Sequence, residues 1–212
     1  MKSTIKLILF TFTLLLNTSS ILAQHIKIDK KTLSFLATEK NINIVFSYDG
    51  LVFNENNLPE KEYLIEISKK LKDSGKDNQV KGLMERYQTS KDSLWPHRFT
   101  TTLNNKLADY KNGAKFTIND SSARYTMRVN NSWMYFGYNV IATKWPAKAK
   151  LDITFYKTSH PDLIIYETTI DKALGTNNEV YNLDKWSKFN RVAKAYEKGA
   201  YKLAQAFKRI VD

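Results

Sequence analysis

Few side chains in this sequence have the types and spacing that acid–base, nucleophilic or metal chemistry requires. The three histidines, His25, His97 and His160, are far apart and lack ligand spacing such as HxxxH. The chain has no cysteine, which excludes disulfides, thiolate metal sites and a cysteine nucleophile. The run 159–162 (SHPD) contains triad residue types, but neighbours in a turn cannot point at one another as a triad requires. Since Gly-rich nucleotide loops and a GxSxG elbow are also missing, the sequence predicts no metal and no cofactor.

An enzyme site could still be assembled from dispersed residues. Asp152, Glu167 and His160 lie in or near one predicted hairpin, and they would suit a hydrolase or a glycan-processing enzyme. Such a site needs a pocket with convergent polar groups of perturbed pKa, which a sequence does not display. We therefore favour a non-catalytic interaction or binding module for an envelope protein or an anionic polymer, and keep the enzyme as the alternative.

The aromatic residues Trp133, Tyr135, Phe136 and Tyr138 are the first of two features that suggest a binding surface. Such rings stack on sugar rings or on bases where they face solvent. Aromatic residues are also ordinary strand formers, so alternate members could instead pack under helices while the others cover a sheet edge. From the sequence we favour this second interpretation.

The second feature is the polar face of a predicted C-terminal helix at 183–211, which is almost uniformly basic. A row of cations along a helix attracts anionic lipid headgroups or glycans, although a charged face on a surface helix is usually just solvated. We do not expect a nucleic acid as the partner. The candidate anion-binding residues are Lys188, Arg191, Lys194, Lys198, Lys202 and Arg209.

The first 23 residues have the three regions of a secretory signal peptide. Lys2 and Lys6 form the basic start, 7–16 (LILFTFTLLL) the apolar centre, and 17–23 (NTSSILA) the polar end with a small last residue. An apolar run this short does not predict a membrane span. We therefore expect a mature chain that starts at Gln24, has no transmembrane helix and is exported to the periplasm or outside the cell.

The charge of the chain is strongly positive. It carries 33 Lys and Arg against 21 Asp and Glu, a formal net charge of +12. Removal of the leader would take away Lys2 and Lys6 and no acidic residue, which leaves +12 − 2 = +10. A basic exported protein attracts anionic partners such as lipid headgroups or acidic glycans. Net charge governs encounter and solubility, so it does not identify the partner.

The most regular stretch of the sequence is 147–174, which predicts a β-hairpin. Apolar residues alternate along 149–155 and β-branched residues along 164–170, as in half-buried antiparallel strands. The other predicted strands are 41–49 and 121–142, the second with a bulge or bend near 130–131 or Gly137.

Apolar spacing and end signals predict helices at 58–75, 80–89, 93–113 and 183–211. In the first of them Leu64, Ile67 and Leu71 should form a buried stripe, and Ser93 should cap the third. The last helix should dock on the sheet through Trp186, Phe189, Ala193, Tyr196, Ala200, Leu203 and Phe207. We therefore predict a single α+β domain over 24–212, with a mostly antiparallel sheet, helices mainly on one face and a long C-terminal helix.

The order of these elements resembles a group of periplasmic α+β modules. An exported leader and the stretch LSFLATEKNINIVFSYDGL precede helices, a long strand (SARYTMRVNNSWMYFGYNV), a hairpin (KAKLDITFYKTSHPDLIIYETTI) and an Ala-rich terminal helix. This layout is similar to the TolB N-terminal domain and to outer-membrane lipoproteins of the penicillin-binding-protein activator type. The resemblance implies an interaction module without an active-site motif, and it covers about residues 33–211 in pattern. The chain lacks the lipidated cysteine of the lipoproteins, so membrane tethering is not implied.

Overall fold

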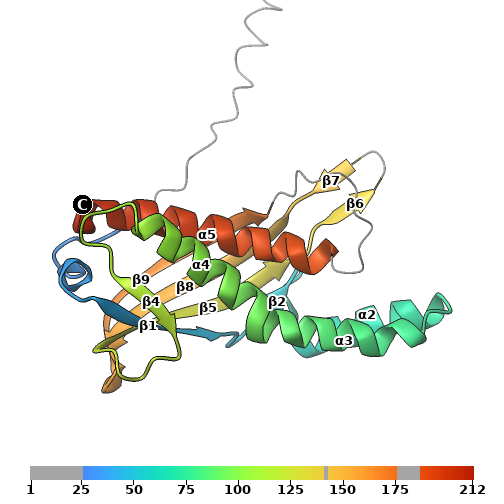
Figure 1. The fold of residues 1–212 in the computed structure, drawn as a ribbon. Coiled ribbons are helices and arrows are strands. Elements are labelled where there is room, and N and C mark those ends of the chain that lie inside the picture. Colours follow the sequence, from blue (N-terminus) through green and yellow to red (C-terminus); the bar gives the residue numbers. More distant parts are fainter. Residues whose placement is uncertain (1–25, 141–142, 176–186) are drawn as a thin grey trace, which may run out of the picture.

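The computed structural model describes residues 26–140, 143–175 and 187–212, and its centre is one mixed β-sheet (Figure 1). Across the sheet the longer strands run in the order β4 (Lys115–Ile118), β1 (Asn41–Ser47), β5 (Tyr125–Tyr135), β8 (Ala147–Lys157) and β9 (His160–Gly175). The short strand β2 (Val52–Phe53) pairs with β5 beyond the end of β1, and β3 (Leu58–Pro59) pairs with β2.

The strand pairing combines an antiparallel half with a parallel half. The predicted hairpin is present as β8 and β9, and β8 also pairs antiparallel with β5. In contrast, β1 pairs parallel with β4 and β5, and β2 pairs parallel with β5. Parallel neighbours need a crossover connection, which the helices between β3 and β4 provide. The α+β class with helices on one face is confirmed, and the crossover makes the sheet mixed.

Helices α4 (Trp95–Leu107) and α5 (Ser187–Val211) lie side by side across one face of the sheet (Figure 1). The ring of Phe207 in α5 stacks on Phe116 at 6.3 Å and meets Phe155 edge-on at 6.0 Å. The predicted docking of this helix is confirmed, except that Trp186 lies outside the described residues. The other docking residues are all buried, namely Phe189, Ala193, Tyr196, Ala200, Leu203 and Phe207.

The predicted helix at 93–113 is wrong at both ends. Helix α3 (Asn78–Thr89) continues through a π-helical turn (Ser90–Leu94) directly into α4, so Ser93 lies inside this turn and caps no helix. Pro96 follows at once, and because proline offers no N–H to the preceding turn, the wider π winding accommodates it. At the other end α4 stops at Leu107, where its last buried side chain lies, and turns follow.

Helix α2 (Glu60–Asp73) is more exposed than the sequence predicts. The predicted stripe of Leu64, Ile67 and Leu71 is only half-buried, and α2 has no fully buried residue. The helix pairs with α3 and extends with it beyond the sheet (Figure 1), so one side of its stripe has no layer to cover it. Pro59 ends β3 and is the N-cap residue of α2, so the helix begins at Glu60 and not at 58.

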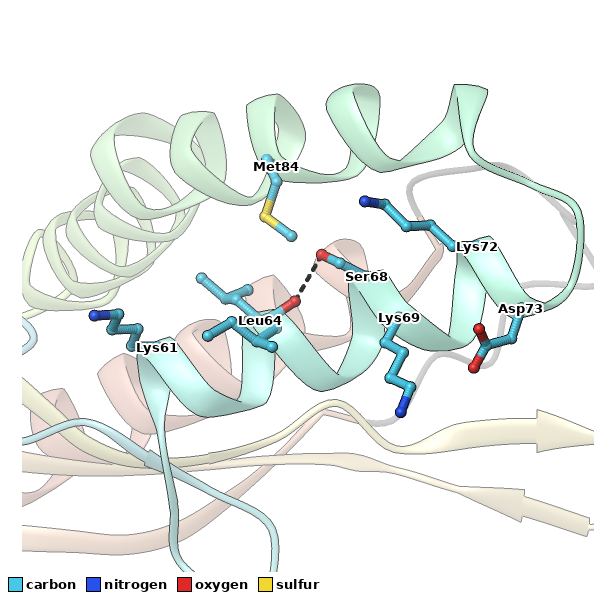
Figure 2. A pocket seen from close by; sticks show the side chains of 8 residues that line it. Lys61, Leu64, Ser68, Lys69, Lys72, Asp73 and Met84 are labelled. Atoms are coloured by element: carbon cyan, nitrogen blue, oxygen red, sulfur yellow. Dashed lines mark hydrogen bonds between the residues drawn. The ribbon is translucent and has the colours of Figure 1, made fainter.

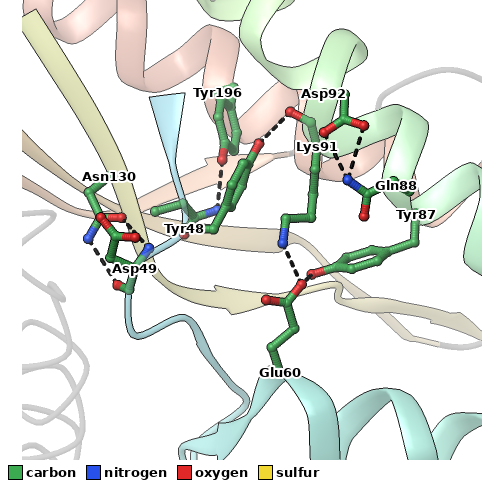
Figure 3. Close-up of polar contacts among 10 residues, drawn as sticks. Tyr48, Asp49, Glu60, Tyr87, Gln88, Lys91, Asp92, Asn130 and Tyr196 are labelled. Atoms are coloured by element: carbon green, nitrogen blue, oxygen red, sulfur yellow. Dashed lines mark hydrogen bonds and ion pairs between the residues drawn. The ribbon is translucent and has the colours of Figure 1, made fainter. Parts of the chain in front are cut away.

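A half-buried polar cluster ties this helical hairpin to the sheet (Figure 3). The Glu60 carboxylate at the start of α2 accepts hydrogen bonds from the Tyr87 hydroxyl at 2.6 Å and from Lys91 Nζ at 2.5 Å. The hydroxyl of Tyr48, beyond the end of β1, donates to the Lys91 carbonyl oxygen at 2.8 Å. Burial, and then the hydrogen bond to Glu60, raise the pKa of Tyr87. Lys91 belongs to the π-helical turn, so this turn supplies the cation of the cluster.

The predicted bulge in the long strand is present in β5, between Asn131 and Trp133. Before the bulge, Met127 and Val129 point into the core under the helices. The extra residue shifts the alternation by one, so Met134 becomes the buried residue and Trp133 moves to the face without helices. A single inserted residue therefore decides which aromatic rings leave the core.

The side chain of Asn131 holds this bulge. It is buried, and its amide lies 2.9 Å from the carbonyl oxygen of Trp133, 3.2 Å from that of Lys150 and 2.8 Å from the hydroxyl of Tyr196. In the orientation that satisfies all three contacts, Nδ2 donates to both carbonyls and Oδ1 accepts from the hydroxyl. One amide thus replaces backbone hydrogen bonds that the bulge disrupts.

A two-stranded ribbon, β6 (Tyr138–Val140) and β7 (Thr143–Trp145), projects from the end of β5 (Figure 1). Gly137 makes the sharp change of direction with φ of +64°, in the left-handed region. A Cβ atom at this position would lie 2.3 Å from the carbonyl oxygen of Trp145, so only glycine fits there. The ribbon brings Tyr138 and Trp145 next to each other above the end of the sheet.

Candidate functional site

Four aromatic side chains converge on a pocket at the end of the helix-free face of the sheet. Trp133 and Tyr135 come from β5 after the bulge, whereas Tyr138 and Trp145 come from the β6–β7 ribbon. The turn at 54–56, after β2, forms the remaining side. The cavity has a volume of about 460 Å³, within the range of small-molecule sites.

The ring positions leave aromatic faces open to solvent. The rings of Tyr138 and Trp145 lie 6.0 Å apart at 31° to each other, and each side chain is 45% exposed. The indole N–H of Trp133 donates to the carbonyl oxygen of Asn54 at 2.8 Å, which fixes the indole against the turn. The pocket therefore combines one indole held by a hydrogen bond with two exposed aromatic side chains.

The polar groups of the pocket are few. Lys148 of β8 lies opposite Tyr135, with Nζ 5.7 Å from the centre of that ring and 6.0 Å from the centre of the Trp145 ring. Burial, and then the nearby Tyr138 and Glu55, raise the pKa of Tyr135. The described lining thus combines aromatic rings with the ammonium of Lys148 and the carboxylate of Glu55, together with side-chain amides from the turn.

The structure agrees only in part with the interpretation of the aromatic run that we favour from the sequence. Phe136 is buried under the helices, but Trp133, Tyr135 and Tyr138 line the pocket. The sequence also gave no role to Trp145, which stands in the connection before the hairpin. A signal was available in the sequence, because the residues without polar groups change from odd positions, Met127 and Val129, to even positions, Met134 and Phe136.

The predicted anion-binding residues of α5 do not form one continuous surface. The Lys188 ammonium lies over the rings of Phe136 and Phe189, 5.7 and 5.3 Å from their centres. Arg191 donates from Nε to the Phe136 carbonyl oxygen at 3.1 Å and from Nη2 to the Gly137 carbonyl oxygen at 3.2 Å. Arg191 therefore holds the segment that leads into the β6–β7 ribbon, and Lys188 packs over the rings beside it.

The other four cations lie further along the helix. Lys194 pairs with Glu197 at 3.0 Å, and burial followed by the neighbouring Lys198 lowers the pKa of Lys202. Lys198 and Arg209 are exposed. The basic face that the sequence predicts is thus divided between structural and exposed cations, which weakens it as a single anion site.

Lys188 should make stability depend on alkaline pH. Burial, followed by Arg86 and Arg191, lowers its pKa from 10.5 to about 8. Between these values the unfolded chain binds more protons than the folded chain, so stability should rise from pH 8 to 10.5. We expect the Lys188 ammonium to reduce the free energy of unfolding by about 1–3 kcal/mol below pH 8. Chemical denaturation of wild type and Lys188→Met at pH 7 and pH 10 measures this: the variant should be more stable at pH 7, and the difference should shrink at pH 10.

The residues proposed for an enzyme site do not converge. Asp152 lies on the helix-free face, where its carboxylate accepts hydrogen bonds from Ser132 at 2.5 Å and Thr169 at 2.8 Å. Glu167 of β9 lies on the same face, where it pairs with Thr154, two residues along β8 from Asp152. His160 pairs with Lys157 at the hairpin turn, three residues along β8 from the partner of Glu167, or about 10 Å along that strand. The hairpin therefore offers no acid–base group in which all three take part.

A second groove lies between α2 and α3, with a volume of about 560 Å³ (Figure 2). Its floor is apolar, and Ile65 beside it is 59% exposed. No feature of the described structure indicates what would cover this groove, so the aromatic pocket is the better candidate site. The residues lining the groove are Lys61, Leu64, Ile65, Ser68, Lys69, Lys72, Asp73 and Met84.

The described parts of the chain contain neither a metal-binding cluster nor a membrane-spanning helix. No three His, Asp or Glu side chains there come close enough to hold a metal ion. No helix there is both long and apolar enough to cross a membrane. In comparisons with known proteins, no family model, no curated protein and no solved structure matches the chain.

Proposed function

We propose that the protein is an exported, non-catalytic binding protein that holds a saccharide unit of an envelope glycan in its aromatic pocket. The observation that carries this proposal is the convergence of Trp133, Tyr135, Tyr138 and Trp145 on one cavity outside the core. Protein cores bury such rings, so four of them around a cavity need another explanation. The apolar C–H face of a sugar ring stacks on an aromatic face while its hydroxyls bond to polar neighbours, which this pocket supplies.

The arrangement favours binding over hydrolysis of a glycan. Glycosidases of the common kind use two carboxyl groups, about 5–5.5 Å apart in retaining enzymes and about 6.5–9.5 Å in inverting ones. Among the described residues that line the pocket, one has a carboxylate, namely Glu55. The next acidic side chain on this face, Asp152, is held by two hydroxyl groups and does not line the pocket. The leader predicted at 1–23 agrees with a partner in the cell envelope, although it lies outside the described residues.

Substitution of the exposed rings tests the proposal. We expect Trp145→Ala and Tyr138→Ala each to weaken glycan binding roughly tenfold, since one stacking contact is worth about 1–1.5 kcal/mol. Affinity electrophoresis in gels that contain envelope polysaccharides measures the retention, and thermal unfolding shows that the fold is intact. Tyr201→Ala is the matched control, because Tyr201 is similarly exposed, at 38%, but belongs to the outer side of α5. Equal retention of all three variants and wild type would rule out the aromatic pocket as the site.

A further inference from the structure

We infer that the saccharide held in the aromatic pocket is acidic, and that Lys148 receives its anionic group. This inference rests on the proposed function and adds the class of ligand. It depends on the position of Lys148, the one cation among the described residues that line the pocket, and on the charged groups near it.

Lys148 is placed for a ligand and not for a partner within the fold. Its Nζ lies near two pocket rings, and it forms no ion pair with another described residue. Lys150, two residues further along the same face of β8, differs in this respect, because its Nζ lies 3.9 Å from Asp152 Oδ1. The neighbouring lysine thus has an acidic partner in the protein, whereas Lys148 faces the cavity without one.

The same placement argues against a cationic ligand. Aromatic cages attract ammonium groups through the negative potential of their ring faces. In this pocket the rings of Tyr135 and Trp145 already have a protein ammonium within 5.7 and 6.0 Å of their centres. A second cation would be repelled, while a carboxylate or sulfate on a sugar ring would be attracted and could still stack beside Lys148.

The carboxylate of the pocket lies on a different element from this cation. Glu55 belongs to the exposed turn after β2, whereas Lys148 belongs to β8, and no ion pair joins them among the described contacts. A carboxylate accepts hydrogen bonds from sugar hydroxyls. The pocket therefore has separate groups for the anionic and the hydroxyl sides of one sugar residue. The formal charge expected for the mature chain, +12 − 2 = +10, would further attract a polymer that carries an acid on every unit.

Paired ligands that differ only in charge test this inference. The probes are hexamers of galacturonic acid and of mannuronic acid, each compared with its methyl ester by isothermal titration calorimetry at low and moderate salt. We expect the full-length mature protein to bind at least one acid about tenfold more tightly than its ester, with the difference shrinking as salt rises. Lys148→Met should abolish that difference, so that the acid binds no more tightly than its ester, because it removes the charge and keeps an apolar side chain of similar length.

Lys150→Met is the matched control, since it removes a cation from the same face and strand without changing the lining of the pocket. It should leave the ratio of acid to ester affinity within about twofold of wild type. Equal affinity for acid and ester, or a ratio that Lys148→Met does not change, would overturn the inference and leave saccharide binding intact. If the wild-type protein bound none of the four ligands, neither the two acids nor their two esters, this result would instead contradict the proposed function.

Discussion

Phe207→Ala is expected to lower the free energy of unfolding by about 3–5 kcal/mol, the range for removing a buried phenylalanine ring. Phe207 is 1% exposed and lies between Phe116 of β4 and Phe155 of β8. Its removal would leave a cavity where α5 meets both halves of the mixed sheet. Neither the helix nor the sheet can close this cavity without moving the other. The cavity should therefore stay largely open, and the loss in the free energy of unfolding should be close to the full range.

Urea denaturation followed by circular dichroism measures this effect. Arg209→Ala is the matched control two residues further along α5, because Arg209 is exposed, and it should change the free energy of unfolding by less than about 0.5 kcal/mol. Similar losses in both variants would show that the helix does not dock through its apolar stripe.

Asn131→Leu is expected to lower the free energy of unfolding by about 2–4 kcal/mol, even though leucine is of similar size and suits a buried position. The substitution would leave the carbonyl oxygens of Trp133 and Lys150 and the hydroxyl of Tyr196 without their shared partner. Buried polar groups that lose a partner each cost about 1–3 kcal/mol, and the apolar burial of leucine offsets part of the sum for the three groups. Because the amide holds the bulge, saccharide binding should also weaken as Trp133 and Tyr135 lose their fixed position.

Tyr196→Phe provides the comparison for this prediction. It removes one of the three contacts of Asn131 and leaves the two carbonyl contacts in place, so it should cost only about 0.5–1.5 kcal/mol and leave pocket binding unchanged. Unfolding and saccharide binding measured on both variants separate the two roles. If Asn131→Leu matched wild type in both measurements, the bulge would be maintained by other contacts.

The sequence by itself determined the elements that depend on local periodicity. Apolar residues at every second position of 149–155 predict a strand with one buried face, and β8 has that strand. The three- and four-residue spacing from Phe189 to Phe207 predicts a docked helix, and those side chains are buried in α5. Such patterns are readable because the geometry of a strand or helix fixes which residues share a face. The leader at 1–23 and the export it implies stay predictions, since they lie outside the described residues.

Only the tertiary structure decided which partners those faces meet. Leu64 and Ile67 of α2 have the spacing of a buried stripe, yet α2 extends beyond the sheet, and spacing does not say whether a covering layer exists. Lys188 and Arg191 look like members of an exposed basic face, but they contact Phe136 and the carbonyl oxygens beside it. The parallel pairing of β1 likewise depends on a crossover whose end point the local sequence does not specify.

The aromatic pocket shows this division most clearly. The aromatic residues were visible in the sequence, and the length of the strand predicted at 121–142 indicated a bulge or bend. A shift of one residue reverses the face of every later side chain in a strand, so Trp133 and Tyr135 lie outside the core because of the bulge between Asn131 and Trp133. Trp145 and Lys148 join them through the β6–β7 ribbon and the pairing of β8 with β5. Composition thus supplied the rings, and long-range strand pairing gathered them into one pocket, because contacts between distant segments depend on the whole fold and not on local spacing.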